Sequence, residues 1–412
     1  MRTPSLPPLL SALLSSLLPP LLSPLWSPFS PPSLPSRLPR LLPRRLPRLL
    51  LRLLLQFLPR FLLPAACAAA APFAHAQQVQ VYGRLNVSLE AARAPGVHAE
   101  RMVNNRSVLG FRGSEDLGGG LKALFQIEGT LAPDSGAGEI ARRDTRVGLE
   151  GAFGTVFAGH WSTAYNGATS SLDPFYPTTA GYMSILANGA AASTDNVADV
   201  ASFDRRQANS VHWWSPRWRG WTLRATHGLP EERPAGGAKP SLLSLALIHD
   251  AGPLYLALAH ERHHEYHGPG TADTGSKAAI GYLSGTTRLA VVAERLAYQL
   301  PAGRLARNAL YVSLSHQAGR HGLRASIGKA GDGHGGGTVG FVRGGADTGA
   351  VHATAGYEYL FSPRTTVYAY HTRLHNDGNA AYDFPINGVK GFTDSLAGAH
   401  ISATSFGLRH SF

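Results

Sequence analysis

The chain has 412 residues, of which 44% are hydrophobic and 16% are charged, and its net charge at neutral pH is +12. Residues 1–76 hold eight of the 38 basic residues and no Lys, Asp or Glu, so residues 77–412 keep 30 basic residues against 26 acidic ones, a balance of only +4. A charge balance this close to neutral excludes a general nucleic-acid-binding face over residues 77–412. Cys67 is the only cysteine, which excludes disulfides, thiolate metal sites and cysteine nucleophiles from residues 77–412.

The first segment has the features of an export signal. Residues 1–51 consist mainly of Leu, Pro, Ser and Arg, and their frequent prolines prevent a continuous helix. Two arginines then precede an apolar run over residues 61–71, and an Ala-x-Ala sequence ends at Ala76. This order is typical of a secretory signal peptide. We therefore predict a low-complexity leader and signal over residues 1–76, cleaved after Ala76. A lipoprotein signal ending at Cys67 is the weaker alternative.

The rest of the chain alternates between apolar and polar residues. Residues 78–90 place Val, Leu or Gly at odd positions and polar or charged residues at nearly all even ones. Successive side chains of a strand point to opposite faces, so this pattern predicts a strand with one apolar and one polar face. The pattern recurs over residues 121–129, 142–150 and 405–412.

The connections between these predicted strands are alternately short and long. The seven short turns lie at 115–120, 151–154, 216–220, 250–253, 284–286, 317–322 and 361–364. The eight longer polar loops lie near 91–102, 131–141, 161–202, 229–240, 263–274, 299–305, 331–349 and 377–399. Fifteen connections predict sixteen antiparallel strands, with both ends of the segment at the short-turn rim. Short turns at one rim and long loops at the other are typical of an outer-membrane barrel, which must close because an open sheet edge is unstable in lipid.

A soluble all-β sandwich or propeller is the alternative fold. It would have a dry apolar core and short loops throughout. Polar residues on the second face of nearly every strand favour a water-filled lumen instead. Aromatic residues near the strand ends are expected to form membrane-interface girdles or a subunit contact. These residues are Trp213, Trp214, Trp218, Trp221, Tyr357, Tyr359, Tyr368 and Tyr370.

Four stretches resemble Gram-negative general porins of the betaproteobacterial type. They are residues 81–86 (VYGRLN), 109–128 (LGFRGSEDLGGGLKALFQIE), 142–161 (RRDTRVGLEGAFGTVFAGHW) and 205–216 (RRQANSVHWWSP) with the closing LRHSF. The resemblance covers essentially all of residues 77–412. It implies an all-β, sixteen-stranded transmembrane barrel that assembles as a homotrimer and passes small hydrophilic solutes passively. It also implies that the long third loop folds into the lumen and forms a constriction.

The resemblance further implies a basic wall that faces acids on this loop. His160 stands where the family has an arginine after a glycine, and Val108 replaces the arginine before Leu-Gly-Phe. Arg106 lies two residues before Val108, so we expect it to share that face of the strand and to replace the lost charge. The predicted basic residues are Arg84, Arg106, Arg146, Arg206 and His160.

Glu128 matches an inward-facing acid of the family, and Asp173 begins the Asp-Pro-Phe motif of the constriction loop. Asp195 and Asp199 are weaker acidic candidates. Phe412 matches the C-terminal aromatic residue that the barrel-assembly machinery reads, which makes this machinery and outer-membrane lipids the expected partners. The arginine-rich wall predicts a mild preference for anions. No enzymatic activity and no cofactor are expected.

The sequence is also compatible with other functions. A substrate-specific channel on the same barrel is motivated by the long third loop, and an outer-membrane hydrolase or an adhesin is a more distant alternative. His260-Glu261-Arg262-His263-His264 matches the zinc-protease pattern, but it follows an alternating strand. In a strand His260 and His264 would lie about 13 Å apart, too far to share a metal. The glycine run 331–340 lacks the Lys-Ser/Thr of a phosphate loop and is predicted to be a loop.

Overall fold

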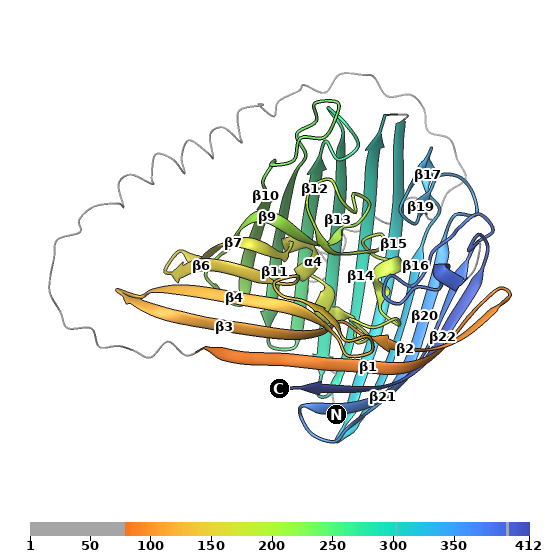
Figure 1. Cartoon of the computed structure of the whole chain (residues 1–412), viewed down its shortest axis with the longest axis horizontal. Helices are drawn as coiled ribbons and strands as arrows, with labels where there is room; N and C mark the ends of the chain where they lie inside the picture. The colour runs from red at the N-terminus through yellow and green to blue at the C-terminus, as the bar shows by residue number, and fades with distance from the viewer. Residues whose placement is uncertain (1–78, 302, 393–394) are drawn as a thin grey trace, which may run out of the picture. The chain divides into compact units, whose positions relative to one another are not determined.

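The computed structural model describes residues 79–301, 303–392 and 395–412. The predicted leader and its cleavage site after Ala76 lie outside these residues. Sixteen antiparallel strands form a closed barrel, as predicted. Closure occurs because β1 (Gln80–Ala94) pairs with β3 (Ser107–Gly118) on one edge and with the last strand, β22 (His400–Ser411), on the other. Figure 1 shows β1 and β22 side by side.

The remaining barrel strands follow one another around the wall in chain order. They are β4 (Leu121–Ala132), β6 (Thr145–Gly151), β7 (Gly154–Ser162), β9 (Asp204–Trp214), β10 (Trp221–Gly228), β11 (Ser241–Ala251), β12 (Leu254–His264), β13 (Ala272–Ser284), β14 (Thr287–Leu300), β15 (Gly303–Ala318), β16 (His321–Ala330), β20 (Ala350–Leu360) and β21 (Thr365–Asn376). Each pairs antiparallel with its neighbours, so register is set strand by strand along the chain.

Shorter elements lie in the connections. The short strands are β2 (Val97–Asn104), β5 (Ala137–Glu139), β8 (Ala190–Thr194), β17 (His334–Gly335), β18 (Thr338–Val339) and β19 (Val342–Arg343). The helical turns are α4 (Ala164–Gly167), η3 (Ser170–Leu172), η4 (Tyr182–Ser184) and η5 (Lys390–Phe392). No helix in this described part of the chain has the length and apolar character needed to cross a membrane.

All seven predicted short turns are confirmed, and two predicted long loops are wrong. Residues 91–102 form a hairpin, because β1 extends to Ala94 and β2 begins at Val97. In the second predicted loop, residues 299–305, Leu300 of β14 pairs directly with Gly303 of β15, so nearly all of its described residues belong to these two strands. Both hairpins lie at the long-loop rim, where both faces of a strand can carry polar residues. The apolar–polar alternation that identifies strands is therefore missing from these two segments.

The expected strand position of Arg106 is also wrong. β2 ends at Asn104 and β3 begins at Ser107, and both pair with β1. Two residues of β1 oppose three residues between Asn104 and Val108, which is a β-bulge. Arg106 occupies this bulge with a left-handed φ of 53°. The alternation of inward and outward side chains, counted back from Val108, therefore does not determine where the Arg106 side chain points.

The distribution of exposure excludes the soluble alternative. On β1 the apolar residues Val81, Leu85 and Leu89 are exposed, whereas Asn86, Ser88 and Glu90 are buried. The same inversion occurs on β15, where Leu310 and Leu314 are exposed, whereas Arg307 and Ser313 are buried. A soluble barrel would bury the apolar set. An apolar outer face with polar residues inside is the arrangement of a membrane barrel.

Three of the predicted girdle residues face the interior instead. Tyr368 and Tyr370 are almost fully buried, and the Tyr368 hydroxyl donates a hydrogen bond to Asn86 Oδ1 at 2.8 Å. Trp214 shares the inward face of β9 with the buried His212. Tyr357, by contrast, is exposed on the outer face, as a girdle residue should be. The interior aromatic residues therefore pack within the wall instead of meeting lipid.

Candidate functional site

The connection between β7 and β9, residues 163–203, is the longest in the described chain and is called here the loop segment. It begins with α4, whose N-cap Thr163 accepts a hydrogen bond from the Asn166 N–H at 3.2 Å. Most of its side chains are buried, including Tyr165, Met183 and Ile185. A polar connection exposed at a rim would not bury such residues. The residues that cover them therefore indicate where the loop segment lies.

Glu294 on β14 is the central partner of the loop segment. Its carboxylate accepts hydrogen bonds from the Tyr165 hydroxyl at 2.6 Å and from the Ala187 N–H at 2.8 Å. It also pairs with Arg307 of β15 at 3.2 Å, and both side chains of that pair are fully buried. One carboxylate thus holds two points of the loop segment, 22 residues apart, against the wall.

Further hydrogen bonds join the loop segment to inward side chains of other strands. They connect Tyr165 N with Ser244 Oγ on β11, Ala168 O with Tyr255 Oη on β12, Thr169 Oγ1 with Lys277 Nζ on β13, Leu172 O with Ser313 Oγ on β15, and Ala180 O with Thr354 Oγ1 on β20. Gly328 on β16 gives room to Ile185, because a Cβ at position 328 would lie 3.0 Å from the Ile185 side chain. The loop segment therefore contacts a large arc of the wall.

Asp173, the first acidic candidate, belongs to this packing. Its carboxylate accepts hydrogen bonds from the Phe175 and Tyr182 N–H groups, both at 3.0 Å, and from the Tyr311 hydroxyl at 2.7 Å. Only 5% of Asp173 is exposed. Burial raises the pKa of this carboxyl group to about 6, and the three hydrogen bonds limit the rise. The geometry fits a residue that shapes the loop segment and attaches it to β15 better than an acid open to the pore.

Arg84 and Arg106 lie opposite another part of the loop segment. The Arg84 guanidinium donates a hydrogen bond to the Arg106 carbonyl oxygen at 3.1 Å. The Arg106 guanidinium in turn reaches the Tyr176 hydroxyl at 3.5 Å. Among the described residues neither arginine forms an ion pair. The structure thus brings two predicted basic residues together beside Tyr176, three residues after Asp173.

Glu128 was predicted to be an acid of the constriction, but in the structure other side chains of the wall occupy its carboxylate. It accepts hydrogen bonds from Arg143 Nε at 2.8 Å and from the Tyr82 hydroxyl at 3.0 Å, so its charge is balanced within the wall. Sequence reasoning did not assign Arg143. The feature of the sequence that could have pointed to Arg143 is the charged run Arg142-Arg143-Asp144 just before β6. Side-chain partners across strands depend on register, which alternation does not supply.

Arg206 forms a second internal pair. Its Nε donates to Asp144 Oδ1 at 2.8 Å, and Asp144 also accepts from the backbone N–H and the hydroxyl of Ser162. His160 lies nearby, with Nδ1 at 3.0 Å from the carbonyl oxygen of Arg143. Arg206, His160 and Arg143 are therefore neighbours, as a wall of basic residues requires, but Asp144 neutralises one member.

Arg146 is held in a different way. Its guanidinium carbon lies 4.4 Å from the ring centre of Trp161, 4.6 Å from that of Phe157 and 5.1 Å from that of Trp214. No acidic residue of the described chain pairs with it, and its Nε and Nη1 atoms are buried without a hydrogen-bond partner. The aromatic rings fix the position of this cation without cancelling its charge.

The weaker acidic candidates lie at one end of the loop segment. Asp195 Oδ1 accepts hydrogen bonds from the N–H groups of Val197 and Ala198, at 2.9 and 2.8 Å, which forms a local turn. Asp199 is exposed and has a left-handed φ of 46°. Neither residue is brought to Arg84 or Arg106 by an ion pair among the described residues.

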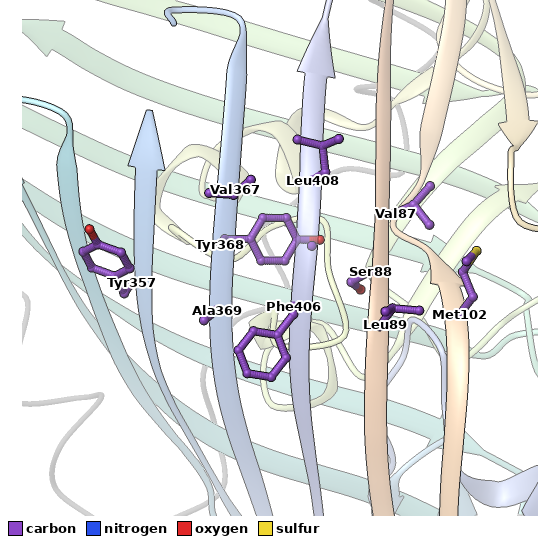
Figure 2. Close-up of a pocket in the computed structure, with 11 residues that line it drawn as sticks. Val87, Ser88, Leu89, Met102, Tyr357, Val367, Tyr368, Ala369, Phe406 and Leu408 are labelled. Carbon is purple, nitrogen blue, oxygen red and sulfur yellow. The ribbon is translucent and has the colours of Figure 1, made fainter. Parts of the chain in front are cut away.

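Two hollows in the barrel differ in chemistry. A groove of about 590 Å³ lies over β1, β21 and β22 and is lined mainly by outward-facing apolar residues (Figure 2). Phe406 and Leu408 of β22 lie there beside Val87 and Leu89 of β1. A polar cavity of about 810 Å³ lies over β1, β3, β4 and β6, and Arg146 lines it. Of these two, the polar cavity is the one that fits hydrophilic solutes.

The zinc-protease pattern lies at the end of strand β12, so the loop predicted over residues 263–274 begins only after His264. His260 is exposed and bonds Ser276 Oγ at 2.8 Å, whereas Glu261 and His263 face inward and bond each other at 2.9 Å. The buried His263 ring stacks on Phe203 of the loop segment, with ring centres 4.2 Å apart. Within the described residues, no group of three or more His, Cys, Asp or Glu side chains is placed to hold a metal ion.

Sequence comparison decides the family. The profile of the Gram-negative porins matches residues 64–379, more than half of the chain. The chain belongs to the Gram-negative porin family. Outer membrane porin protein 32 of Delftia acidovorans is 26% identical over 317 residues, which cover 74% of this chain and 84% of that porin. Major outer membrane protein P.IA of Neisseria meningitidis serogroup C is 31% identical over 134 residues, but these cover only 27% of this chain and 35% of that protein.

Solved porin structures share the fold. The anion-selective porin from Comamonas acidovorans superposes with a TM-score of 0.68 at 22% identity, covering 82% of this chain and all of that one. A trimer form of OmpT from Vibrio cholerae gives a TM-score of 0.59 at 17% identity, covering 82% of this chain and all of that one. These porins are outer-membrane channels, so the family is one of pores and not of enzymes, and the outer membrane is its location.

Proposed function

We propose that this porin is a passive diffusion channel for ions and small hydrophilic solutes, with a mild preference for anions. The observation that carries the proposal is the inverted barrel, with an apolar outer face and a polar interior that contains the uncompensated cations Arg84, Arg106 and Arg146. Fixed cations along an aqueous path attract anions and repel cations. No step of this function requires a chemical reaction.

The loop segment is proposed to lie in the lumen and to narrow it. Its hydrogen bonds to Ser244, Tyr255, Lys277, Glu294 and Ser313 support this location, because these side chains all belong to the inward, buried face of the wall. The constriction would then lie between the Tyr176 part of the loop segment and the basic wall. That wall consists of Arg84, Arg106, Arg143, Arg146, His160 and Arg206.

Acids take a secondary part in this proposal. Glu128 and Asp144 lower the net charge of the wall by pairing with Arg143 and Arg206, and Asp173 keeps the loop segment in shape. This division supports a weak anion preference instead of a strong one. The alternative of a substrate-specific channel would be favoured by a site that binds one class of solute.

Assembly is proposed to follow the family. A homotrimer is supported by the trimer form of the related OmpT structure and by the apolar outer face of the barrel. Phe412 at the end of β22 is the proposed signal for the barrel-assembly machinery, and lipids of the outer membrane would contact Leu243, Leu245 and similar outward residues.

Liposome swelling tests the proposal. Vesicles that contain the purified porin should swell at rates that fall steadily as neutral sugars of increasing size are supplied, and the rate should stay nearly linear in sugar concentration. Saturation at low concentration would favour the substrate-specific alternative. Rates equal to those of protein-free vesicles would contradict the proposed channel.

A further inference from the structure

The interior arginines fall into two groups that differ in what holds them. Arg143 and Arg206 are each held by a carboxylate at 2.8 Å, so a passing ion meets a nearly neutral pair. Arg112 and Arg146 are held by aromatic rings and neutral groups instead. The Arg112 guanidinium lies 5.0 Å from the ring centre of Tyr82 and donates to Gln80 Oε1 at 2.9 Å. A ring attracts a cation without neutralising it, so the second group keeps its full charge in a fixed position.

Arg112 and Arg146 face the same cavity. In the sheet register Arg112 of β3 lies opposite Gln126 of β4, and Gln126 lies opposite Arg146 of β6. The two arginines are therefore separated by two strand spacings, or about 10 Å between Cα atoms. Both side chains line the polar cavity of about 810 Å³, and so does Lys122. Glu150 is the one acidic residue among those that line this cavity in the described chain.

The position of this cavity is at the short-turn end of the barrel. Lys122 is the second residue of β4, directly after the turn that follows Gly118. Glu150 lies opposite Lys122 and next to the turn between β6 and β7. The cavity thus extends from Arg146 toward the short turns, whereas Arg84 and Arg106 lie at the proposed constriction near Tyr176; Arg146 belongs to both places.

A third ring-held arginine extends the group along the wall. Trp214 lies between two guanidinium groups, with Arg146 at 5.1 Å and Arg224 of β10 at 4.8 Å from its ring centre. Arg224 forms no ion pair among the described residues, and its Nε is buried without a partner. One indole ring therefore keeps two positive charges in place without neutralising them, although Nε and Nη1 of Arg146 and Nε of Arg224 are themselves buried.

We propose that Arg112, Lys122 and Arg146 form a binding site for small carboxylates at the short-turn end of the lumen, with Arg224 as the next cation along the wall. The exposed Arg112 can donate two parallel N–H···O bonds from its Nη groups to a carboxylate, which chloride cannot accept in this way, whereas the partly buried Arg146 contributes its charge. The Gln80 and Gln126 side chains, which line the same cavity, add neutral hydrogen-bonding groups. This site rests on the proposed channel function and adds to it a class of solute and a second point of selection.

Reversal potentials in planar bilayers test this site. Sodium acetate on one side and sodium chloride on the other give the acetate-to-chloride permeability ratio, and a sodium chloride gradient gives the anion-to-cation ratio. We expect Arg112→Gln and Arg146→Gln each to lower both ratios about two- to threefold, the effect of removing one unit charge several ångströms from an aqueous ion path. Arg112 is exposed, so its variant folds even if the ring-packed Arg146 variant does not.

A matched control and a comparison complete the test. Arg219 also lies over a tryptophan, 5.3 Å from the ring of Trp218, but in the turn between β9 and β10, so Arg219→Gln should leave both ratios unchanged. Removing a neutral pair with Glu128→Gln and Arg143→Gln together should shift the ratios less than Arg146→Gln does. Unchanged ratios in Arg112→Gln, or an equal shift from the pair deletion, would overturn the site while the channel function stands. A wild-type protein without current would overturn both.

Discussion

Phe412 closes the barrel by covering Gly83. The backbones of these two residues form reciprocal N–H···O hydrogen bonds of 3.1 Å, which extend the pairing of β22 with β1 to the last residue of the chain. The phenyl ring occupies the space beside Gly83, where a Cβ would lie 2.3 Å from Cζ of Phe412 and 2.8 Å from the carbonyl oxygen of Val108. A side chain at position 83 would therefore displace the terminal ring and press on the backbone of β3.

Gly83→Ala is expected to lower the free energy of unfolding by about 1–3 kcal/mol, the usual cost of overpacking a close contact. Unfolding by urea in detergent micelles, followed by tryptophan fluorescence, measures this. Gly336→Ala is the matched control, because a Cβ at position 336 meets no atom within 4 Å and its φ is not left-handed. Equal stability of the two variants would contradict the assigned contact.

Phe412→Ala should keep the backbone hydrogen bonds but slow barrel assembly. The ring contributes apolar contact where the two ends of the barrel meet, and the proposed assembly signal is lost with it. Pulse-labelling of cells, followed by the appearance of the heat-modifiable folded form, measures the assembly rate. Phe406→Ala on the same strand, whose ring is exposed on the outer face, is the control. Equal rates for both variants would remove the special role of the terminal residue.

Glu294→Gln should release the loop segment. The substitution leaves Arg307 buried without its charged partner and weakens the contacts of Tyr165 and Ala187, which predicts a loss of about 3 kcal/mol in unfolding free energy. Single-channel recordings should show a higher mean conductance and more frequent current fluctuations. Tyr165→Phe removes only one hydrogen bond and should cost about 1 kcal/mol. Wild-type conductance in Glu294→Gln would contradict the lumenal position of the loop segment.

The stability of the barrel should depend on Asp173 between pH 4 and pH 7. Burial raises the pKa of Asp173 from its ordinary value of 3.8 to about 6, so the folded protein binds a proton that the unfolded chain has already released. This contribution is fully present below about pH 4 and is lost as pH rises through about 6, with an upper limit of about 3 kcal/mol. The free energies of unfolding of the wild type and Asp173→Asn, each measured at pH 4 and at pH 7, separate the contribution of Asp173 from those of other carboxyl groups. An identical pH dependence in both proteins would exclude Asp173 as its source.

Reversing the charge of Arg146 should reverse the ion preference. Arg146→Glu replaces an uncompensated cation of the interior with an anion, so the mild preference for anions should become a preference for cations. The reversal potential in a tenfold potassium chloride gradient measures this directly. A reversal potential equal to that of the wild type would place Arg146 away from the ion path.

The barrel was predictable from sequence because its signals are local. Alternation over residues 78–90 and the Gly-rich turns depend only on neighbours in the chain, so strand number and short turns were correct. The bulge at Arg106 and the hairpin after Ala94 were missed, because neither changes the local composition. Ion pairs such as Arg206 with Asp144 depend on register between strands distant in sequence, which alternation does not determine.

The sequence predicted which residues lie at the candidate site but not what each of them contacts there. Arg84 and Arg146 lie on the polar face that the alternation over residues 78–90 and 142–150 predicted. Alternation could not show that aromatic rings hold Arg146 and that a carboxylate holds Arg206. Asp173 was assigned to the pore from a motif, and the structure surrounds it with three donors instead. Motifs identify which residues approach a site, whereas hydrogen-bond partners decide what each residue does there.

Single-channel recording of the porin purified from outer membranes is the decisive test of the proposed anion-preferring channel. We expect stepwise conductance in a planar bilayer, closure in thirds of the total current at high voltage, and a reversal potential in a salt gradient whose sign shows anions to be more permeant. Insertion without current would contradict the channel function, and a cation-preferring reversal potential would contradict the assigned role of the uncompensated arginines.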